Sequence, residues 1–400
     1  MSDEKERESL EKGLEKIEAM QLNELQNEED ALKTFEQDKI EEPKPKKHKW
    51  LGNILLIAVI AVGVYLMFKI TSEFSGEANK SFGEAMASVD TLYLFITLVV
   101  LLAVIVLDSM KYSVVMSAVS GKYHPLIGAQ TSFLGKYYDN ITPFSTGGQP
   151  MQIYNLYKKG FPGGSSGAIV MIKYFANTFV WLLISGLLMA LNASAFSLVE
   201  KTTRATIKAF AWVSWGINML VPLFIVTFLL LPKLSYKMTS GIISLGAKLR
   251  IVKDKDKTLQ KAIKVVEDFR ASFSIMVKHP FKFIWLLCCC ALEISLTFAF
   301  PYFVAKMFGE LKMVDTGLQA ILNIMTVNAF TSFAVSLIPT PGNSGFWEGA
   351  SSMAFKSIAT SAWVLFTWRF LVYYIYIVIG IVIYAARLII NLAAGHKRRA

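Results

Sequence analysis

Seven long apolar runs constrain the fold of this 400-residue chain more than any other feature. They cover residues 50–68, 91–107, 167–191, 209–231, 283–308, 318–338 and 361–388. A helix needs about 20 apolar residues to cross a bilayer, and in hydrocarbon only helices and closed barrels satisfy their backbone hydrogen bonds. With 54% hydrophobic and 18% charged residues, the chain is also too apolar for a typical soluble protein. We therefore expect an all-α, polytopic integral membrane protein.

The distribution of charge predicts which parts of the chain face the cytoplasm. Basic clusters lie at residues 44–49 and 396–399, and the segment 232–282 carries twelve Lys and Arg residues against four acidic ones. By the positive-inside rule, both termini and the 232–282 loop are cytoplasmic. Because two cytoplasmic termini require an even number of crossings, we expect about eight. Residues 339–360 are the predicted eighth crossing, since residues 316–347 contain no charge.

These signals divide the chain into three parts. Residues 1–49 form an acidic arm with a basic juxtamembrane cluster, residues 50–392 form the transmembrane domain, and residues 393–400 form a basic tail. The arm holds 15 of the 30 acidic side chains and is either a short amphipathic or coiled-coil helix or a disordered tail. Within the transmembrane domain, the 232–282 loop is expected to be an amphipathic helical hairpin on the inner leaflet.

The same composition limits the partners. A basic excess beside apolar spans favours a multi-pass protein of the cell membrane that contacts anionic phospholipids. No basic patch interleaved with aromatic residues lies outside the spans, so we expect no nucleic-acid partner. The oligomeric state, including a homo-oligomer, stays open.

Two common motifs of enzyme chemistry are absent from the sequence. It contains no His-Glu-x-x-His and no Walker-type phosphate loop. The three cysteines, Cys288 to Cys290, are consecutive and would point in different directions on a helix, while the four histidines are scattered. We therefore expect no catalytic residue, no cofactor and no metal site.

Two Pro/Gly-rich polar segments interrupt the apolar sequence at corresponding places in its two halves. The first runs from Thr142 to Gln152 and the second from Pro339 to Glu348. Non-helical backbone at membrane depth survives only where protein or a water-filled cavity surrounds it, and paired breaks point to a transporter's binding site. In the first half, residues 112–160 are expected to form an amphipathic helix followed by a re-entrant or half-crossing element. The candidate lipid-binding residues are Asn140, Pro143, Gly147, Gly148, Gln149, Gln152, Pro339, Pro341, Gly342, Gly345 and Glu348.

Each break predicts a helix whose N-terminus could bind a head group. Pro150 suits the first position of one helix, whose N–H groups and neighbouring glycines would receive a phosphate. Asn343 or Ser344 can cap the second helix, and Glu348 in its first turn would attract an amine. The plainer alternatives stay open: Glu348 only stabilises its helix, and the glycines only allow close helix packing.

Four further charged residues are predicted to lie within the membrane, and three of them, Lys173, Glu293 and Arg369, are candidates for a polar path. Lys173, Glu293 and Arg369 lie inside apolar sequence, where an unpaired charge costs about 2.5–3.5 kcal/mol on insertion scales. Glu293 and Arg369 are partners in sign, either as a structural ion pair or as part of the path. Asp108, with Lys111, lies near the predicted end of the second span, where such side chains commonly extend to the interface.

The two broken segments resemble the signatures of a known family. Residues Lys136 to Tyr154 and Ile338 to Glu348 are similar to those of the flippase-like family. This family corresponds to the transmembrane domain of lysylphosphatidylglycerol synthase, the multiple peptide resistance factor. The resemblance covers roughly residues 50–392, and its second signature has a Pro-x-x-Gly-x-x-Gly-x-x-Glu pattern. Many members carry an acidic residue and an arginine after the first glycines, and Gln149 and Gln152 stand near those places here.

The resemblance implies a multi-pass protein of the bacterial plasma membrane that moves a phospholipid or lipid-linked head group between leaflets. Aminoacylated phosphatidylglycerol would be one such lipid, and its transport is connected with resistance to antimicrobial peptides. Full-length synthases also carry a soluble domain that transfers lysine from tRNA to phosphatidylglycerol, and this chain, which ends at Ala400, is expected to lack it.

Two other functions stay open. One is a membrane subunit of a phosphatidylglycerol lysyltransferase-type enzyme that works with a separate soluble transferase. The other is a structural or regulatory protein that docks through residues 1–42.

Overall fold

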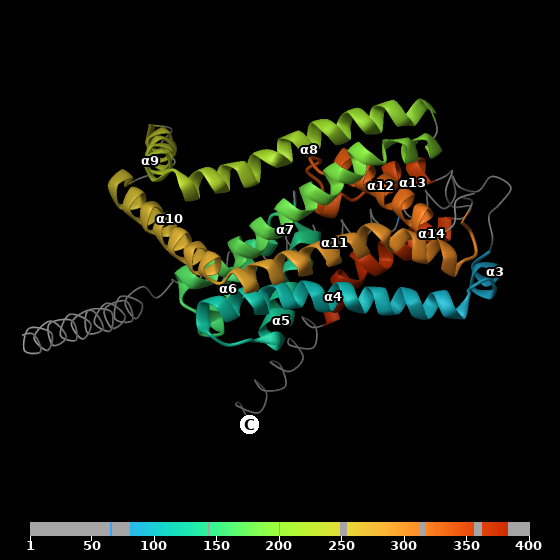
Figure 1. The fold of residues 1–400 in the computed structure, drawn as a ribbon, viewed down its shortest axis with the longest axis horizontal. Helices are drawn as coiled ribbons and strands as arrows, with labels where there is room; N and C mark the ends of the chain where they lie inside the picture. Colours follow the sequence, from blue (N-terminus) through green and yellow to red (C-terminus); the bar gives the residue numbers. More distant parts are fainter. Residues whose placement is uncertain are drawn as a thin grey trace, which may run out of the picture. The chain divides into compact units, whose positions relative to one another are not determined.

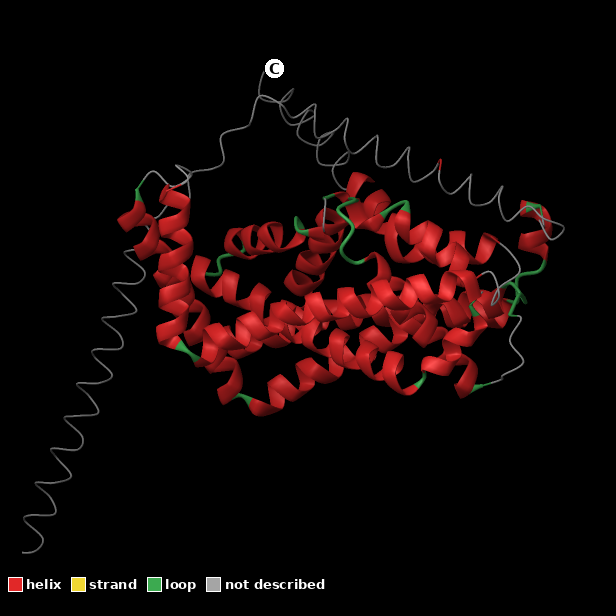
Figure 2. Ribbon diagram, turned by 90° about the horizontal axis from the view of Figure 1, so that it is seen from above, coloured by secondary structure: helices red, strands yellow, loops and turns green. Residues whose placement is uncertain are grey.

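The computed structural model describes residue 65 and residues 81–142, 145–199, 201–248, 254–311, 317–355 and 362–382. Within these ranges the chain forms helices joined by turns, without a β-strand (Figures 1 and 2). The all-α prediction is therefore confirmed. The acidic arm, the basic tail and nearly all of the predicted first span lie outside the described residues.

Six segments in the described ranges are long and apolar enough to cross a membrane. They are α4 (Thr91–Ser120), α7 (Gly163–Leu191), α8 (Lys201–Leu230), α11 (Pro280–Met307), α12 (Leu318–Val335) and the segment Trp363–Val382, which contains most of α14 (Ala362–Arg369) and the π-helix η4 (Phe370–Tyr374). Each coincides with one predicted apolar run, which confirms the polytopic architecture. The count of eight crossings and the side on which the termini lie stay predictions.

The structure describes eight further helices. They are α3 (Phe82–Ala87), α5 (Pro125–Ile141), α6 (Gly148–Lys158), η2 (Ala193–Leu198), α9 (Pro232–Lys248), α10 (Lys255–Lys278), η3 (Pro341–Asn343) and α13 (Phe346–Phe355). Helices α9 and α10 lie in the 232–282 loop and contact each other, while their arrangement as a hairpin on the inner leaflet stays a prediction. Helix α13 has ten residues and is about 15 Å long, half the thickness of the hydrocarbon core. It cannot form the predicted eighth crossing alone.

Helix α4 is longer than the sequence predicted. It begins where the Asp90 carboxylate accepts hydrogen bonds from the N–H groups of Leu92 and Tyr93 at 2.8 and 3.1 Å. It ends at Gly121, whose left-handed backbone (φ +74°) is a common helix terminator. No break occurs near Leu107, so that predicted end was wrong. Helix α4 continues past Leu107 although Asp108 and Lys111 follow. These two charged residues are buried, and other helices supply their ion-pair partners.

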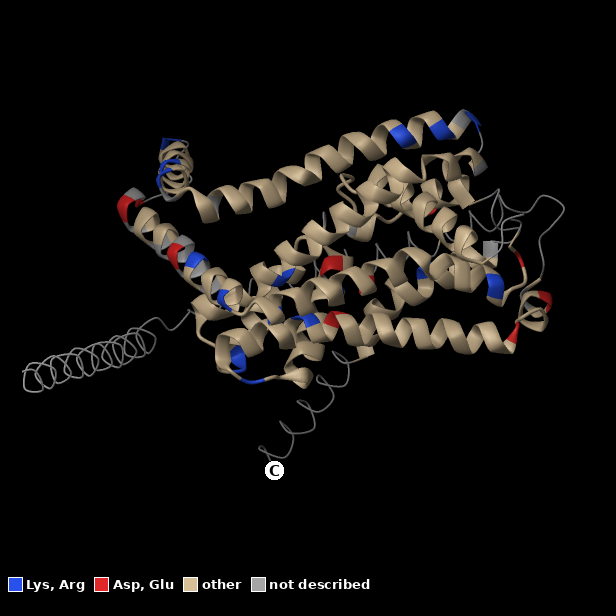
Figure 3. Cartoon of the chain, in the orientation of Figure 1, with Lys and Arg blue, Asp and Glu red and all other residues tan. Residues whose placement is uncertain are grey.

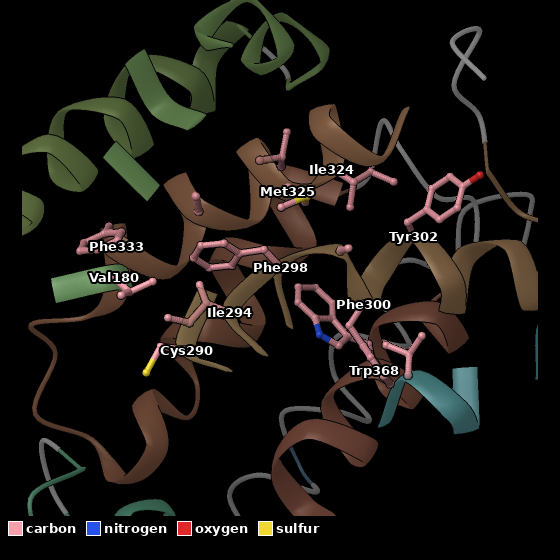
Figure 4. Packing of buried hydrophobic residues seen from close by; sticks show 14 of the residues in the cluster. Val180, Cys290, Ile294, Phe298, Phe300, Tyr302, Ile324, Met325, Phe333 and Trp368 are labelled. Carbon is pink, nitrogen blue, oxygen red and sulfur yellow. The ribbon is translucent and has the colours of Figure 1, made fainter. Parts of the chain in front are cut away.

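Helix α11 is the central packing element of the bundle. It packs against α4, α7, α12 and α14, and Figure 4 shows its Phe298 in the same hydrophobic cluster as Phe333 of α12. Trp181 of α7 stacks on Phe333 with ring centroids 3.9 Å apart. Large apolar side chains such as Phe95 on α4 and Leu220 on α8 are exposed, as expected for helix faces in contact with lipid.

Candidate functional site

The two Pro/Gly breaks lie against each other. Helix α5 contacts η3. Tyr373 forms hydrogen bonds with Asn140 on the first side and with Ser344 on the second. The side-chain amide of Asn140, at the end of α5, donates to the Tyr373 carbonyl at 3.1 Å, while the Tyr373 hydroxyl donates to the Asn140 carbonyl at 2.8 Å. The same hydroxyl accepts a hydrogen bond from Ser344 of the second break at 3.1 Å. Two segments 200 residues apart in the sequence thus form one structural unit.

Each break contains backbone in the left-handed region. Ser145 (φ +51°) and Asn343 (φ +56°) are the non-glycine residues with positive φ in the described ranges. Such backbone costs about 1–3 kcal/mol per residue and is concentrated at binding and switch sites. Gly342 has the same sign of φ (+55°), and a Cβ atom there would overlap the Tyr373 ring. Position 342 therefore requires glycine for both conformation and space.

The second break contains a buried ion pair. The Arg369 Nε donates to Glu348 Oε1 at 2.8 Å, and its Nη2 donates to the Gly342 carbonyl at 2.8 Å. The other Glu348 oxygen accepts from the Gly345 N–H at 2.6 Å. Glu348 thus caps α13 from its first turn, as predicted, and also neutralises an arginine. Both of its oxygens have partners in this conformation, so its charge is already neutralised without an amine.

The N–H groups predicted to receive a phosphate at the first break already have acceptors. Gly147 donates to the Thr142 hydroxyl at 2.9 Å, and Gly148 donates to the Asp139 carboxylate at 2.8 Å. Helix α6 begins at Gly148 and not at Pro150. The Asp139 carboxylate occupies the helix N-terminus, where negative charge is stabilising. The expectation of free donors at these glycines is therefore contradicted.

The remaining candidates of the two signatures have more ordinary positions. Gln152 is buried between α6 and α5, where a Cβ on Gly135 would overlap its side chain, so it fixes the packing of these helices. Gln149 is half-buried and Pro339 is exposed. Pro341 begins η3, and Pro143 lies outside the described residues.

A cavity of about 390 Å³ lies where the two breaks meet. Its polar lining comes from both breaks and from the facing spans, and consists of Ser145, Asn218, Thr297, Asn328, Ser332, Ser336, Asn343 and Arg369. Three tryptophans, Trp181, Trp347 and Trp368, line it as well. Among the described lining residues Arg369 alone carries a charge, and its guanidinium carbon lies 4.4 Å from the ring centroid of Trp347. A cation with amide and hydroxyl groups around it can bind an anion.

A second ionic group, here called the ionic cluster, lies on unbroken helices and consists of Asp108 and Lys111 (α4), Lys136 (α5), Lys173 (α7) and Glu293 (α11). Asp108 lies 2.8 Å from the Lys111 ammonium and 3.1 Å from that of Lys173. Glu293 lies 3.4 Å from Lys111 and 3.9 Å from Lys136. Figure 3 shows basic and acidic residues inside the bundle, part-way along helices that are mostly uncharged.

The ionic cluster corrects two expectations. Asp108 and Lys111 are 2% and 1% exposed, so they do not extend to an interface. Ser132 of α5 donates to Asp108, and Lys111 donates to the Asn177 side chain at 2.7 Å. Glu293 pairs with lysines while Arg369 pairs with Glu348, so the two candidates of opposite sign have separate partners. Arg369 with Glu348 and the ionic cluster are therefore separate groups within the described residues.

Sequence reasoning missed several residues at these sites. Lys136 and Asp139 stand inside the first signature, and their spacing of three places them on one side of α5. That spacing of charges was an available signal. Tyr373 had none, because an aromatic residue in an apolar run is ordinary core sequence. Asn218 and Asn328 were equally indistinct, although an amide inside a span is a hydrogen-bonding group in need of a partner.

Comparison with known proteins assigns the chain to a family. Residues 53–380 match the family described as the lysylphosphatidylglycerol synthase TM region. The chain belongs to this family. Membership confirms the resemblance noted in the sequence and indicates a role in the modification or translocation of membrane lipids. No curated protein and no solved structure matches the chain. Both the cavity and the ionic cluster lie within the matched residues.

Proposed function

We propose that this protein translocates phospholipids or lipid-linked head groups, aminoacylated phosphatidylglycerol among them, between the leaflets of the bacterial plasma membrane. The observation that carries the proposal is the polar cavity between the two breaks, with its buried arginine. Moving a polar head group through hydrocarbon without hydrogen-bond partners is costly. A cavity inside a bundle of apolar helices lowers that cost by replacing the water that the head group loses.

Arg369 is the proposed phosphate ligand. A guanidinium presents donors in a planar fork that matches the geometry of a phosphate. The neighbouring amides of Asn218 and Asn328 can supply further donors, and the tryptophans can contact the glycerol and upper acyl chains. When Arg369 turns toward a phosphate, Glu348 loses one hydrogen bond but keeps that from Gly345. A lipid with an amine could then satisfy Glu348 as well.

The proposal is tested by reconstituting the purified protein into liposomes that contain a fluorescent phosphatidylglycerol. Accessibility of the label to an added quencher measures translocation. We expect the wild type to accelerate it and Arg369→Gln to slow it by about tenfold or more, because a hydrogen bond to a charged group is lost. Glu348→Gln should have a smaller effect. Arg204→Gln is the matched control, since Arg204 contacts the backbone of residues 197 and 199 and lies outside the cavity.

Two outcomes contradict the proposal. If the wild type does not accelerate translocation of phosphatidylglycerol or of lysylphosphatidylglycerol, the chain is not a translocase for these lipids. If both cavity variants translocate lipid at the wild-type rate, Arg369 and Glu348 have no part in the mechanism.

Lipid modification is the second candidate function, because the family is described by a synthase. Here the cavity would hold phosphatidylglycerol for a separate soluble transferase. Incubation of the purified chain with lysyl-tRNA and phosphatidylglycerol, with and without such a transferase, distinguishes the two. Lysylphosphatidylglycerol detected by mass spectrometry only when both proteins are present would favour this function.

A further inference from the structure

A second, smaller cavity shares a wall with the first. It has a volume of about 30 Å³ and is lined by Lys136, Tyr376 and five further residues. A site needs about 10–15 Å³ to hold one water molecule, so this cavity has room for about two. Thr297 of α11 and Val372 of η4 line both cavities. Lys136 therefore lies on the far side of a two-residue wall from the cavity that contains Arg369.

Lys136 makes the longest ion pair of the ionic cluster and is its most exposed lysine. Its ammonium lies 3.9 Å from Glu293, whereas the other ion pairs of the cluster measure 2.8, 3.1 and 3.4 Å. Its side chain is 32% exposed, compared with 1% for Lys111 and 15% for Lys173. Its ammonium also lies over the face of the Tyr376 ring, 5.5 Å from the ring centroid, and interacts at longer range with the carboxylates of Asp108 and Asp139. This lysine is thus best placed to accept a new anion.

We propose that Lys136 is a second phosphate-binding position, to which the head group passes from Arg369 across the wall formed by Thr297 and Val372. The ligand is a phosphate-bearing lipid head group with a net negative charge. The inference rests on the proposed function and adds to it a route through the bundle. It places the ionic cluster in transport, where Lys111 and Lys173 hold Asp108 and Glu293 in position.

The pairing of each cation with a carboxylate fits such a route. Movement through a membrane protein requires sites that bind strongly enough to admit the ligand and weakly enough to release it. Arg369 has Glu348 and Lys136 has Glu293, so each phosphate contact competes with a resident carboxylate. When the phosphate leaves, the carboxylate pairs with the cation again. Each buried charge then has a partner again. This matters because a buried charge without a partner is strongly unfavourable.

The experiment separates binding from passage. Native mass spectrometry in detergent measures binding of phosphatidylglycerol, and the liposome assay measures its translocation. For Lys136→Gln we expect binding within about twofold of the wild type and translocation slowed by about tenfold, the effect of losing a hydrogen bond to a charged group. Arg369→Gln should lose both. Lys136→Arg, which keeps the charge, should restore translocation to within about threefold, as expected when a cationic donor is retained.

Lys306→Gln is the matched control. Lys306 lies on α11, also over aromatic rings, those of Tyr93 and Tyr302, and lines neither cavity. A wild-type rate of translocation by Lys136→Gln overturns the inference, and so does an equal loss of binding and translocation.

Because Lys136→Gln can fail to fold, Thr297→Phe provides a second test that keeps both cations and places a larger side chain in the shared wall. It should slow translocation more strongly than it weakens binding.

The outcomes also distinguish this inference from the proposed function. A wild type that does not move phosphatidylglycerol or lysylphosphatidylglycerol contradicts the proposed function. A wild type and a Thr297→Phe variant that move them equally fast contradict only the route through Lys136.

Discussion

The two buried ionic groups of this protein differ in what holds them. Arg369 and Glu348 bind the backbone of the second break, through the Gly342 carbonyl and the Gly345 N–H. The ionic cluster around Asp108, in contrast, is held by side chains from four unbroken helices, α4, α5, α7 and α11. The first group therefore shapes an irregular segment, while the second cross-links regular ones.

The groups also differ in redundancy. In the described structure Glu348 has one cationic partner, whereas Asp108 and Glu293 each have two lysines. Removing one partner from a buried pair leaves an uncompensated charge, which is more costly than weakening a pair that retains a second partner. Loss of one charged side chain should therefore destabilise the protein more at the Arg369–Glu348 pair than in the ionic cluster. Three substitutions test this, from the largest expected effect to the smallest.

Arg369→Met should cause the greatest loss. It leaves Glu348 buried without a cation and removes the donor to the Gly342 carbonyl, so we expect a cost of about 3–5 kcal/mol. The measurement is the free energy of unfolding in detergent micelles. The double variant Glu348→Gln/Arg369→Met removes the unpaired charge and should recover part of the loss. A cost for Arg369→Met no larger than that for Lys173→Met would contradict the comparison.

Gly342→Ala tests whether the break itself depends on its conformation. The left-handed backbone costs a non-glycine residue about 1–2 kcal/mol, and overpacking adds about 1–3 kcal/mol because the new Cβ meets the Tyr373 ring. The unfolding measurement should therefore show a clear loss. Gly349→Ala in α13 is the control, since no atom lies within 4 Å of its added Cβ. We expect that control to be neutral or to gain about 0.5–1 kcal/mol.

Lys173→Met should have the smallest effect of the three. Asp108 keeps Lys111 and the Ser132 hydroxyl, so only one of its charged hydrogen bonds is lost, at a cost of about 1.5–3 kcal/mol. Lys111→Met should cost more, because Lys111 contacts Asp108, Glu293 and the Asn177 side chain. If the two variants lost equal amounts of unfolding free energy, Lys111 would contribute no more than Lys173, which would contradict the contacts described for it.

Much of the fold could be predicted because hydrophobic length is a local property. Six of the predicted runs coincide with helical segments, and the two breaks are where their proline and glycine residues placed them. The end of α4 was mispredicted for a physical reason. Asp108 and Lys111 look like an interface in sequence, but their neutralising partners come from other helices and allow α4 to continue to Ser120.

The candidate site was less predictable. The sequence located the segments that contribute to the cavity and correctly placed Glu348 in a helix first turn. It could not show that Asp139 and Glu348 already occupy the N–H groups of Gly148 and Gly345. Pairing between side chains depends on which helix faces meet, and a single sequence does not contain that information.

By itself, the sequence determined that this protein is a bundle of apolar helices interrupted twice, since water and lipid dictate where such segments lie. Only the tertiary structure decided that the two interruptions meet through Tyr373, that Arg369 pairs with Glu348, and that Lys136 stands behind Thr297. The physical reason is that burying an apolar helix is non-directional and set by composition, whereas hydrogen bonds and ion pairs need defined distances between residues far apart in the chain.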